Sequence, residues 1–275
     1  MLVLIDVSNL IYRAFYTLPV DKFKSSDGTI LNAVYGVCTM IMKIAADFKD
    51  AHLVCCFDSA TCNAERKKID PQYKANRAKA PSELGPQFKL VRELIKSMEL
   101  EMLDIENMEA DDIIASLVET YYKTNEIIIC SPDKDYSQLL QYSNVVQYDP
   151  KKKKYINADD IIDKYKVDPS RFTLYQALLG DKCDNVPGCP GIGPKIAAEL
   201  VNLSNGTLNH LLTLNHKKIE LVKKNLDSVE RSLALVTLTK RDITIDFRET
   251  NIINELFRQF CEKCEFSSIV KKYYK

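Results

Sequence analysis

Short apolar runs alternate with amphipathic stretches along the first 156 residues of the chain. The runs at 1–6, 52–58 and 127–130 carry few polar residues, a pattern typical of strands that are buried on both faces of a parallel sheet. A shorter run follows at 100–103. Apolar residues at helical spacing predict intervening helices at 8–16, 31–48, 86–97 and 110–123. This alternation predicts an α/β domain built on a parallel sheet.

The rest of the chain has a different pattern. A hairpin is predicted at 145–155, with four consecutive lysines in its solvated turn. Beyond it the spacing is helical, and a glycine-rich connection at 188–193 joins two of the helices. We therefore expect an α/β domain at 1–165 and a helical subdomain at 166–275. The segment 59–86 is polar, basic and poor in core residues, and it interrupts the first domain.

Composition is that of a globular protein, with 46% hydrophobic and 28% charged residues. No apolar run approaches the roughly 18 residues that a membrane span needs. The apolar start carries Asp6 and no preceding Lys or Arg, which argues against a signal peptide. The nine cysteines are scattered, and the pair Cys261 and Cys264 lacks the second pair that a zinc site requires. We expect reduced thiols in a cytoplasmic protein.

Acidic residues follow the predicted strands at the point where each strand ends. Asp6 and Asp58 close two of them, and Asp133 and Asp135 follow the third after a short turn. A single such residue is most often a helix cap or a turn residue. In a parallel sheet, however, ligands bind outside the carboxyl ends of the strands. The repetition at three strands therefore predicts that these carboxylates converge on one cleft.

Two further acidic clusters lie near predicted helices. Glu109 and Asp112 are three apart and so share a helix face, with Asp111 beside them, and Asp181 and Asp184 are again three apart. The nine candidate metal ligands are Asp6, Asp58, Glu109, Asp111, Asp112, Asp133, Asp135, Asp181 and Asp184. So many carboxylates repel one another unless cations neutralise them. Oxygen ligands suit Mg²⁺ or Mn²⁺, and two such ions about 3.5 to 4 Å apart commonly cleave phosphodiesters.

The charge balance, the positions of the histidines and the absence of a nucleotide-binding loop narrow the range of possible reactions further. The formal net charge is zero, but with the nine carboxylates set aside 29 acidic residues remain against 38 basic ones, a balance of +9 that suits a nucleic-acid partner. The three histidines lie away from the acidic clusters, which argues against a histidine-based mechanism. No G-x-x-x-x-G-K-[ST] loop is present, which argues against NTP hydrolysis.

Together these motifs resemble the 5′ nuclease (flap endonuclease) superfamily, and most closely the 5′-3′ exonuclease domain of bacterial DNA polymerase I. The matching segments, which span residues 2–201, are LIDVSNLIYRAFY, AVYGV, FDSA, YKANR, MEADD, SPDKDYSQLL and LLGDKCDNVPGCPGIGPKIAAELV. The chain departs from the family at Val7 and Pro132, where glycine is usual. The resemblance implies a structure-specific 5′-3′ exonuclease or flap endonuclease that hydrolyses DNA, and RNA primers as a second substrate, in replication and repair. We expect a stand-alone monomer beside a separate DNA polymerase.

The resemblance also implies roles for basic residues. It makes 59–86 an arch over a 5′ single strand, with Lys74, Arg77 and Arg13 as catalytic cations at the scissile phosphate. Within the arch, Arg66 and Tyr73 would contact DNA, the tyrosine by stacking on a base. The alternative for this segment is a solvated mobile loop.

The glycine-rich connection resembles the helix–turn–helix variant (H3TH) that holds duplex DNA around a monovalent cation such as K⁺. Gly188, Gly191 and Gly193 would let the backbone approach phosphate, and Lys195 would pair with one. Two other functions compete with this one. A catalytically inactive nucleic-acid-binding paralogue is disfavoured by the full set of carboxylates, and an RNA-directed nuclease of the related PIN-like fold is disfavoured by this hairpin.

Overall fold

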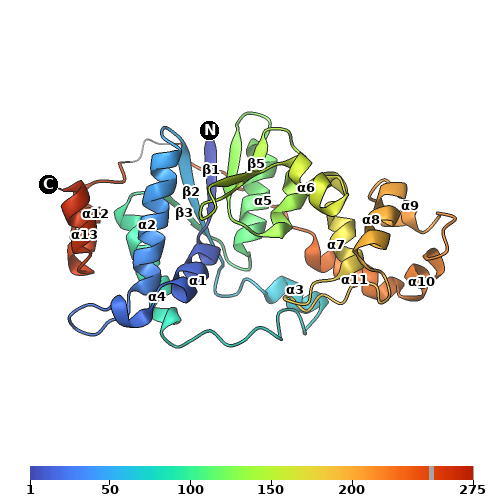
Figure 1. Ribbon diagram of the computed structural model, residues 1–275, viewed down its shortest axis with the longest axis horizontal. Coiled ribbons are helices and arrows are strands. Elements are labelled where there is room, and N and C mark those ends of the chain that lie inside the picture. The colour runs from blue at the N-terminus through green and yellow to red at the C-terminus, as the bar shows by residue number, and fades with distance from the viewer. Residues whose placement is uncertain (248–250, 275) are drawn as a thin grey trace.

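A six-stranded sheet forms the centre of the computed structural model, which describes residues 1–247 and 251–274 (Figure 1). The strand order is β3-β2-β1-β4-β5-β6. The strands are β1 (Leu2–Asp6), β2 (His52–Phe57), β3 (Glu101–Asp104), β4 (Ile127–Cys130), β5 (Val145–Asp149) and β6 (Lys154–Ile156). Neighbouring strands are parallel except for β6, which forms an antiparallel hairpin with β5. The predicted parallel α/β core and the hairpin are confirmed.

The central strand explains why the apolar runs are uninterrupted. In β1, Leu2 and Leu4 face one hydrophobic core, and Val3 and Ile5 face another. Both faces of the sheet are therefore covered, so polar alternation has no place in the strand. The first face is covered by α5 (Ala110–Tyr121), η2 (Lys134–Leu139) and α6 (Ala158–Tyr165). The second face is covered by α1 (Val7–Thr17), α2 (Asn32–Asp47) and α4 (Leu84–Ser97).

The strand order places three strand ends side by side. The chain runs from β1 outward to β2 and β3, then returns to β4 on the other side of β1. The carboxyl ends of β2, β1 and β4 thus adjoin at a point where the direction of winding reverses, which is where ligands bind in open α/β sheets. The connection between β2 and α4 contains one short helix, α3 (Ala64–Ile69), and a long run of turns.

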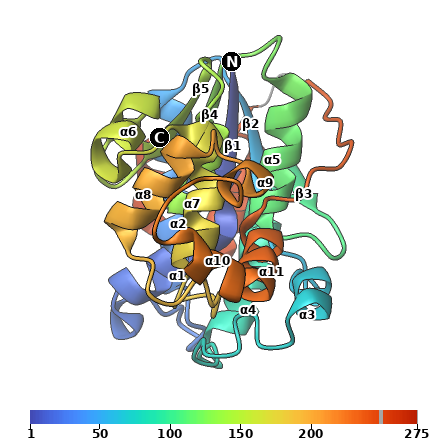
Figure 2. The ribbon, with the colours of Figure 1, turned by 90° about the vertical axis from the view of Figure 1, so that its right-hand side faces the viewer.

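A group of helices lies at one end of the molecule (Figures 1 and 2). These helices are η3 (Pro169–Arg171), α7 (Phe172–Leu179), α8 (Pro194–Leu203), α9 (Leu208–Leu211), α10 (Ile219–Lys224) and α11 (Leu226–Val236). α7 packs against α8 and α11. The connection between α7 and α8 contains the predicted glycine-rich turn. The one-turn helix η1 (Val20–Lys22) lies instead in the α1–α2 loop.

The last two helices correct the predicted division of the chain. α12 (Glu255–Lys263) and α13 (Ser267–Tyr273) lie at the end opposite α8 to α11 (Figure 1). Phe257, Phe260 and Phe266 belong to the same core as α2 and α4. The prediction that 166–275 forms one helical subdomain is therefore wrong for these helices. Helical periodicity reports an apolar face but not the surface on which that face packs.

The segment that joins α11 to the C-terminal helices runs along α5. Its backbone donates hydrogen bonds to side chains of that helix: Thr239 N to Asp112 Oδ1 at 2.8 Å, and Arg241 N to Ser116 Oγ at 3.0 Å. These hydrogen bonds hold the chain that follows α11 against α5. In the described part of the chain, no helix combines the length and apolarity that crossing a bilayer demands.

Candidate active site

Asp6 and Asp58 occupy the ends of neighbouring strands, and both also cap helices. Asp6 Oδ1 accepts a hydrogen bond from Asn9 N at 2.9 Å at the start of α1. Asp58 Oδ1 accepts one from Ala110 N at 2.8 Å at the start of α5. The capping role and the predicted site role therefore coincide. Val7 begins α1 directly after Asp6 and is fully buried, so this turn does not require the glycine expected there.

Five of the nine predicted acidic residues lie around one cavity. The cavity is lined by Glu109, Asp111, Asp135, Asp181 and Asp184, which come from α5, the turn after β4 and the loop after α7. Burial is the main cause of the raised pKa values of the carboxylates in this region, and repulsion between the carboxylates adds to it. Burial and the nearby charge of Asp58 raise the pKa of Asp6 to about 7. Burial and the charge of Asp133 raise the pKa of Asp135 to about 7. Burial and the charge of Asp6 also raise the pKa of Asp111.

Tyr136 connects two of these carboxylates and was not predicted from the sequence. Its hydroxyl lies 2.5 Å from Asp111 Oδ1 and 3.2 Å from Asp6 Oδ2, and the ring is fully buried. Gln176 plays a similar part, because its Nε2 donates to Asp135 Oδ1 at 2.6 Å. The only local signal for Tyr136 is its position directly after the D-K-D turn. Gln176 has no local signal, since it reaches the site from α7.

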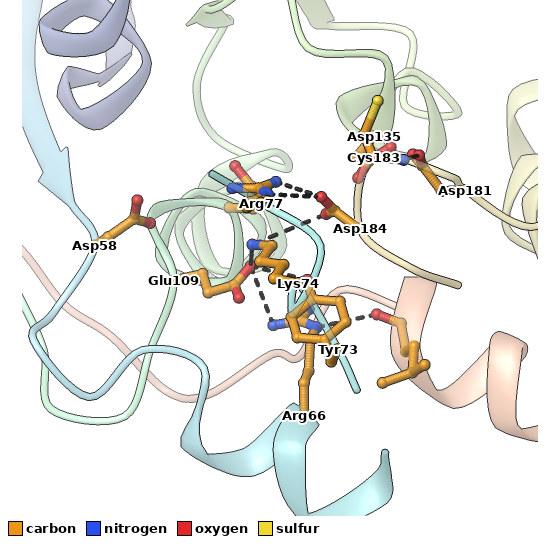
Figure 3. Close-up of polar contacts among 12 residues, drawn as sticks. Asp58, Arg66, Tyr73, Lys74, Arg77, Glu109, Asp135, Asp181, Cys183 and Asp184 are labelled. Carbon is orange, nitrogen blue, oxygen red and sulfur yellow. Dashed lines mark hydrogen bonds and ion pairs between the residues drawn. The ribbon is translucent and has the colours of Figure 1, made fainter. Parts of the chain in front are cut away.

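The predicted catalytic cations Lys74 and Arg77 point into the carboxylates (Figure 3). Lys74 Nζ lies 2.8 Å from Glu109 Oε2 and 3.9 Å from Asp184 Oδ2. Arg77 Nε donates to Asp184 Oδ1 at 3.0 Å. Burial alone would lower the pKa of Lys74, but the charges around it, of which Glu109 contributes most, together outweigh burial and raise the pKa. The site thus holds cationic side chains against its carboxylates.

A third cation, Lys134, was not singled out by the sequence. Its Nζ lies 2.6 Å from Asp181 Oδ2. Burial of Asp181 raises its pKa, but the hydrogen bond and charge of Lys134 outweigh burial and leave the pKa lowered. Asp181 is thereby distinguished from Asp6 and Asp135, which have no cation this close among the ion pairs of the described residues.

Three predicted basic or aromatic contacts are placed differently. Arg66 and Tyr73 are 6% and 4% exposed, so neither side chain is presented to DNA as we expected. Arg66 instead forms a bidentate pair with Asp112. Arg13 pairs with Asp149 at 3.3 Å and does not join the carboxylate cluster. All three side chains differ from the prediction for the same reason. Each has a buried acidic partner in the folded protein that its sequence motif does not indicate.

The donor set fits hard divalent cations, although the carboxylates are not preassembled around one. Over residues 1–247 and 251–274, no three potential ligands stand together as a ready metal site. Lys74, Arg77 and Lys134 occupy oxygens that metals would otherwise take. Two observations support the fit. Glu109 Oε1 is buried without a hydrogen-bond partner, and the charge of a neighbouring carboxylate adds to burial in raising the pKa of Asp6 and of Asp135.

The glycine-rich connection is packed tightly by its own backbone. Gly180 and Gly188 have φ values of 72° and 69°, and a Cβ on Gly188 would lie 2.5 Å from Gly180 N. Gly188 N donates to Ser232 Oγ of α11 at 2.9 Å. Gly188 is buried, so its backbone is not free for the phosphate we expected it to approach. Glycine is required there by the close packing of two chain segments.

The exposed part of this connection begins α8. Gly191 has a φ of 84°, and Gly193 is the N-terminal cap residue of α8, with Pro194 in its first turn. Lys195 is exposed beside them. Free N–H groups at such a helix start are suited to an anion. The structure therefore leaves Gly191, Gly193 and Lys195 accessible as the sequence predicted.

Comparison with known proteins gives matches along the chain. Residues 1–166 match the family model of the 5′-3′ exonuclease N-terminal resolvase-like domain, and residues 167–257 match that of the 5′-3′ exonuclease C-terminal SAM fold. The chain is 33% identical over 277 residues to a 5′-3′ exonuclease of Aquifex aeolicus, covering 98% of this chain and 94% of that one.

Two other matches come from a longer protein and from a solved structure. The chain is 39% identical over 258 residues to DNA polymerase I of Rhizobium leguminosarum, which covers 89% of this chain but only 25% of the polymerase. A flap endonuclease of bacteriophage T5, crystallised with DNA and metal ions, has a similar fold with a TM-score of 0.66 at 20% identity. That alignment covers 96% of this chain and 98% of the phage protein.

Proposed function

Since the chain belongs to the 5′-3′ exonuclease family, we propose that it is a metal-dependent 5′ nuclease that hydrolyses DNA at branched or free 5′ ends. The observation that carries the proposal is the convergence of five acidic side chains on one cavity beside Lys74 and Arg77. Such a combination suits a phosphodiester, which brings negative charge that the carboxylates alone would repel.

Eight of the nine predicted carboxylates remain our candidates for holding divalent cations. They are Asp6, Asp58, Glu109, Asp111, Asp133, Asp135, Asp181 and Asp184. Two bound Mg²⁺ or Mn²⁺ ions would activate water and stabilise the leaving oxygen. Asp112 is left out because Arg66 and Thr239 N already occupy both of its oxygens.

Two residues of the arch, Lys74 and Arg77, supply positive charge close to the substrate. Lys74 and Arg77 now neutralise Glu109 and Asp184. When cations neutralise those carboxylates instead, the two side chains become available to the scissile phosphate, where charge builds in the transition state. Tyr136 orients Asp6 and Asp111 through its hydroxyl.

The helical part supplies the grip on duplex DNA. We assign this contact to Gly191, Gly193 and Lys195 at the start of α8, with K⁺ as the cation of the hairpin. Phosphate contacts of this kind are independent of sequence and weaken with salt. The chain spans 25% of the DNA polymerase I that it matches. We also propose a DNA polymerase as a partner of the protein. RNA primers paired with DNA are the second substrate class, and we propose that the protein acts as a monomer in the cytoplasm.

Cleavage of a 5′-labelled flap duplex tests the proposal. We expect cutting near the junction with Mg²⁺, none with EDTA, and a loss on the order of 100-fold in Asp111→Asn. Asp163→Asn is the matched control, since Asp163 is exposed on α6. Binding of the flap without cleavage in both Mg²⁺ and Mn²⁺ would identify the inactive paralogue instead. Cleavage that persists in EDTA would refute the metal-dependent mechanism.

A further inference from the structure

Arg66 uses its guanidinium entirely within the protein. Nη1 donates to Asp112 Oδ2 at 2.6 Å and Nη2 donates to Asp112 Oδ1 at 2.8 Å, so the pair is bidentate. Nε donates to Leu235 O at 2.9 Å, and Nη2 also reaches Thr237 O at 3.4 Å. The two charged side chains are 7% and 5% exposed. A buried ion is tolerated only when its hydrogen bonds are satisfied in this way.

Both oxygens of Asp112 already accept hydrogen bonds from within the protein. Oδ2 accepts from Arg66, and Oδ1 accepts from Arg66 and from Thr239 N at 2.8 Å. Its neighbour Glu109 is different, because Glu109 Oε1 is buried without a hydrogen-bond partner. The two acidic residues at this helix start therefore differ, because both oxygens of Asp112 have partners within the protein, whereas only Oε2 of Glu109 has one.

The pair also joins three parts of the molecule. Arg66 lies on α3 in the arch, Asp112 lies on α5, and Leu235 lies near the end of α11 (Figure 3 shows Arg66 and the arch). Arg66 Nη1 is 3.6 Å from Glu109 Oε2, the oxygen to which Lys74 donates. α11 in turn holds the glycine-rich turn between α7 and α8 through Ser232.

We propose that Arg66 and Asp112 form a positioning node that fixes the arch and α11 on α5, and that Asp112 is not a metal ligand. The node sets where Glu109 and Lys74 lie, so it acts on cleavage through them. This role rests on the proposed nuclease function, whereas the ion pair itself also governs folding stability. Removing one partner leaves a buried charge unpaired, while removing both leaves none.

The test is a double-mutant cycle with Arg66→Met and Asp112→Asn. Asparagine keeps an oxygen for Thr239 N, and methionine keeps the apolar stem of the arginine. Each variant is unfolded with urea in EDTA and assayed on the flap duplex over a range of Mg²⁺ concentrations. We expect each single variant to have a lower urea midpoint and cleavage reduced on the order of 100-fold, because misplaced catalytic groups cost about that much.

The double variant distinguishes a positioning role of Asp112 from a role as a metal ligand. We expect it to regain most of the urea midpoint, to cleave at least about tenfold faster than either single variant, and to need the same Mg²⁺ concentration as the parent for half-maximal cleavage. A double variant no better than Asp112→Asn, with a raised Mg²⁺ requirement, would make Asp112 a metal ligand and overturn the node. If the parent cleaves nothing with any divalent cation, the proposed function fails, but the unfolding cycle in EDTA still tests the pair.

Discussion

Lys74 Nζ donates a hydrogen bond of 2.8 Å to Glu109 Oε2, and this contact joins the arch to the helix that carries the acidic cluster. The two residues are 35 positions apart in the chain. Lys74 has a left-handed backbone with a φ of 57°, and its N–H donates to Asp184 O at 2.9 Å. Both the side chain and the backbone of Lys74 are therefore directed at the site.

Replacing Lys74 tests whether its ammonium acts on the substrate. We expect Lys74→Met to reduce cleavage by about 10² to 10³-fold while the affinity for duplex DNA changes little, because the lost charge is needed at the scissile phosphate. The measurement is single-turnover cleavage beside a binding titration. Lys68→Met is the matched control, since Lys68 lies in the same segment but is exposed and paired with Glu65. Equal rates for the two variants would contradict the assignment.

Tyr136 is expected to support the carboxylates without touching DNA. Tyr136→Phe removes the hydroxyl that lies between Asp6 and Asp111. We expect the free energy of unfolding to fall by about 1 to 2 kcal/mol and the Mg²⁺ concentration for half-maximal cleavage to rise about tenfold or more. Tyr142→Phe is the control, because the Tyr142 hydroxyl donates to Glu119 away from the site. An unchanged Mg²⁺ requirement would confine Tyr136 to packing.

The stability of the metal-free protein should depend on pH in a direction set by Asp6 and Asp135. Both have a pKa of about 7 in the folded protein, against about 3.9 in an unfolded chain. Between these values the folded state holds more protons, so raising the pH through this window lowers the free energy of unfolding. We expect the urea midpoint in EDTA to fall between about pH 5 and about pH 7.5.

Mg²⁺ should reduce the fall of the urea midpoint with rising pH. A cation that binds the carboxylates only in the folded protein stabilises the folded state most at a pH at which the carboxylates are ionised. The measurement is a set of urea titrations at several pH values, with EDTA in one series and Mg²⁺ in the other. A midpoint in EDTA that rises over the same range would contradict the raised pKa values.

The packing of Gly188 against Gly180 predicts a strong effect of one added methyl group. Gly188→Ala would place Cβ 2.5 Å from Gly180 N in a backbone with a φ of 69°. We expect a loss of about 1 to 3 kcal/mol in the free energy of unfolding and weaker duplex binding, measured by urea unfolding and by titration with DNA. Gly85→Ala is the control, because nothing lies within 4 Å of its added Cβ. A loss of the same size at Gly85 would remove the steric explanation.

The sequence by itself determined the parallel core and the strand-end carboxylates. Strands buried on both faces leave an uninterrupted apolar run, and the residue that ends such a run is placed at the sheet edge by the strand itself. Asp6 and Asp58 could therefore be found without knowing what lies around them. The order of the motifs added the predicted arch and hairpin, and Lys74 and Arg77 of the arch pair with Glu109 and Asp184.

Only the tertiary structure decided which charges meet. Arg66 and Asp112 are 46 positions apart, and nothing local distinguishes Arg66 from the exposed lysines beside it. Its burial depends on α5 and α11 packing at the same place. The contact of Tyr136 with Asp111 likewise depends on the packing of η2 against α5. The docking of α12 on α2 and α4 is of the same kind, because an amphipathic pattern requires a partner surface but does not specify it. Residue types and local spacing are set by neighbours along the chain, whereas ion pairing and burial are set by distances between segments that only the folded chain brings together.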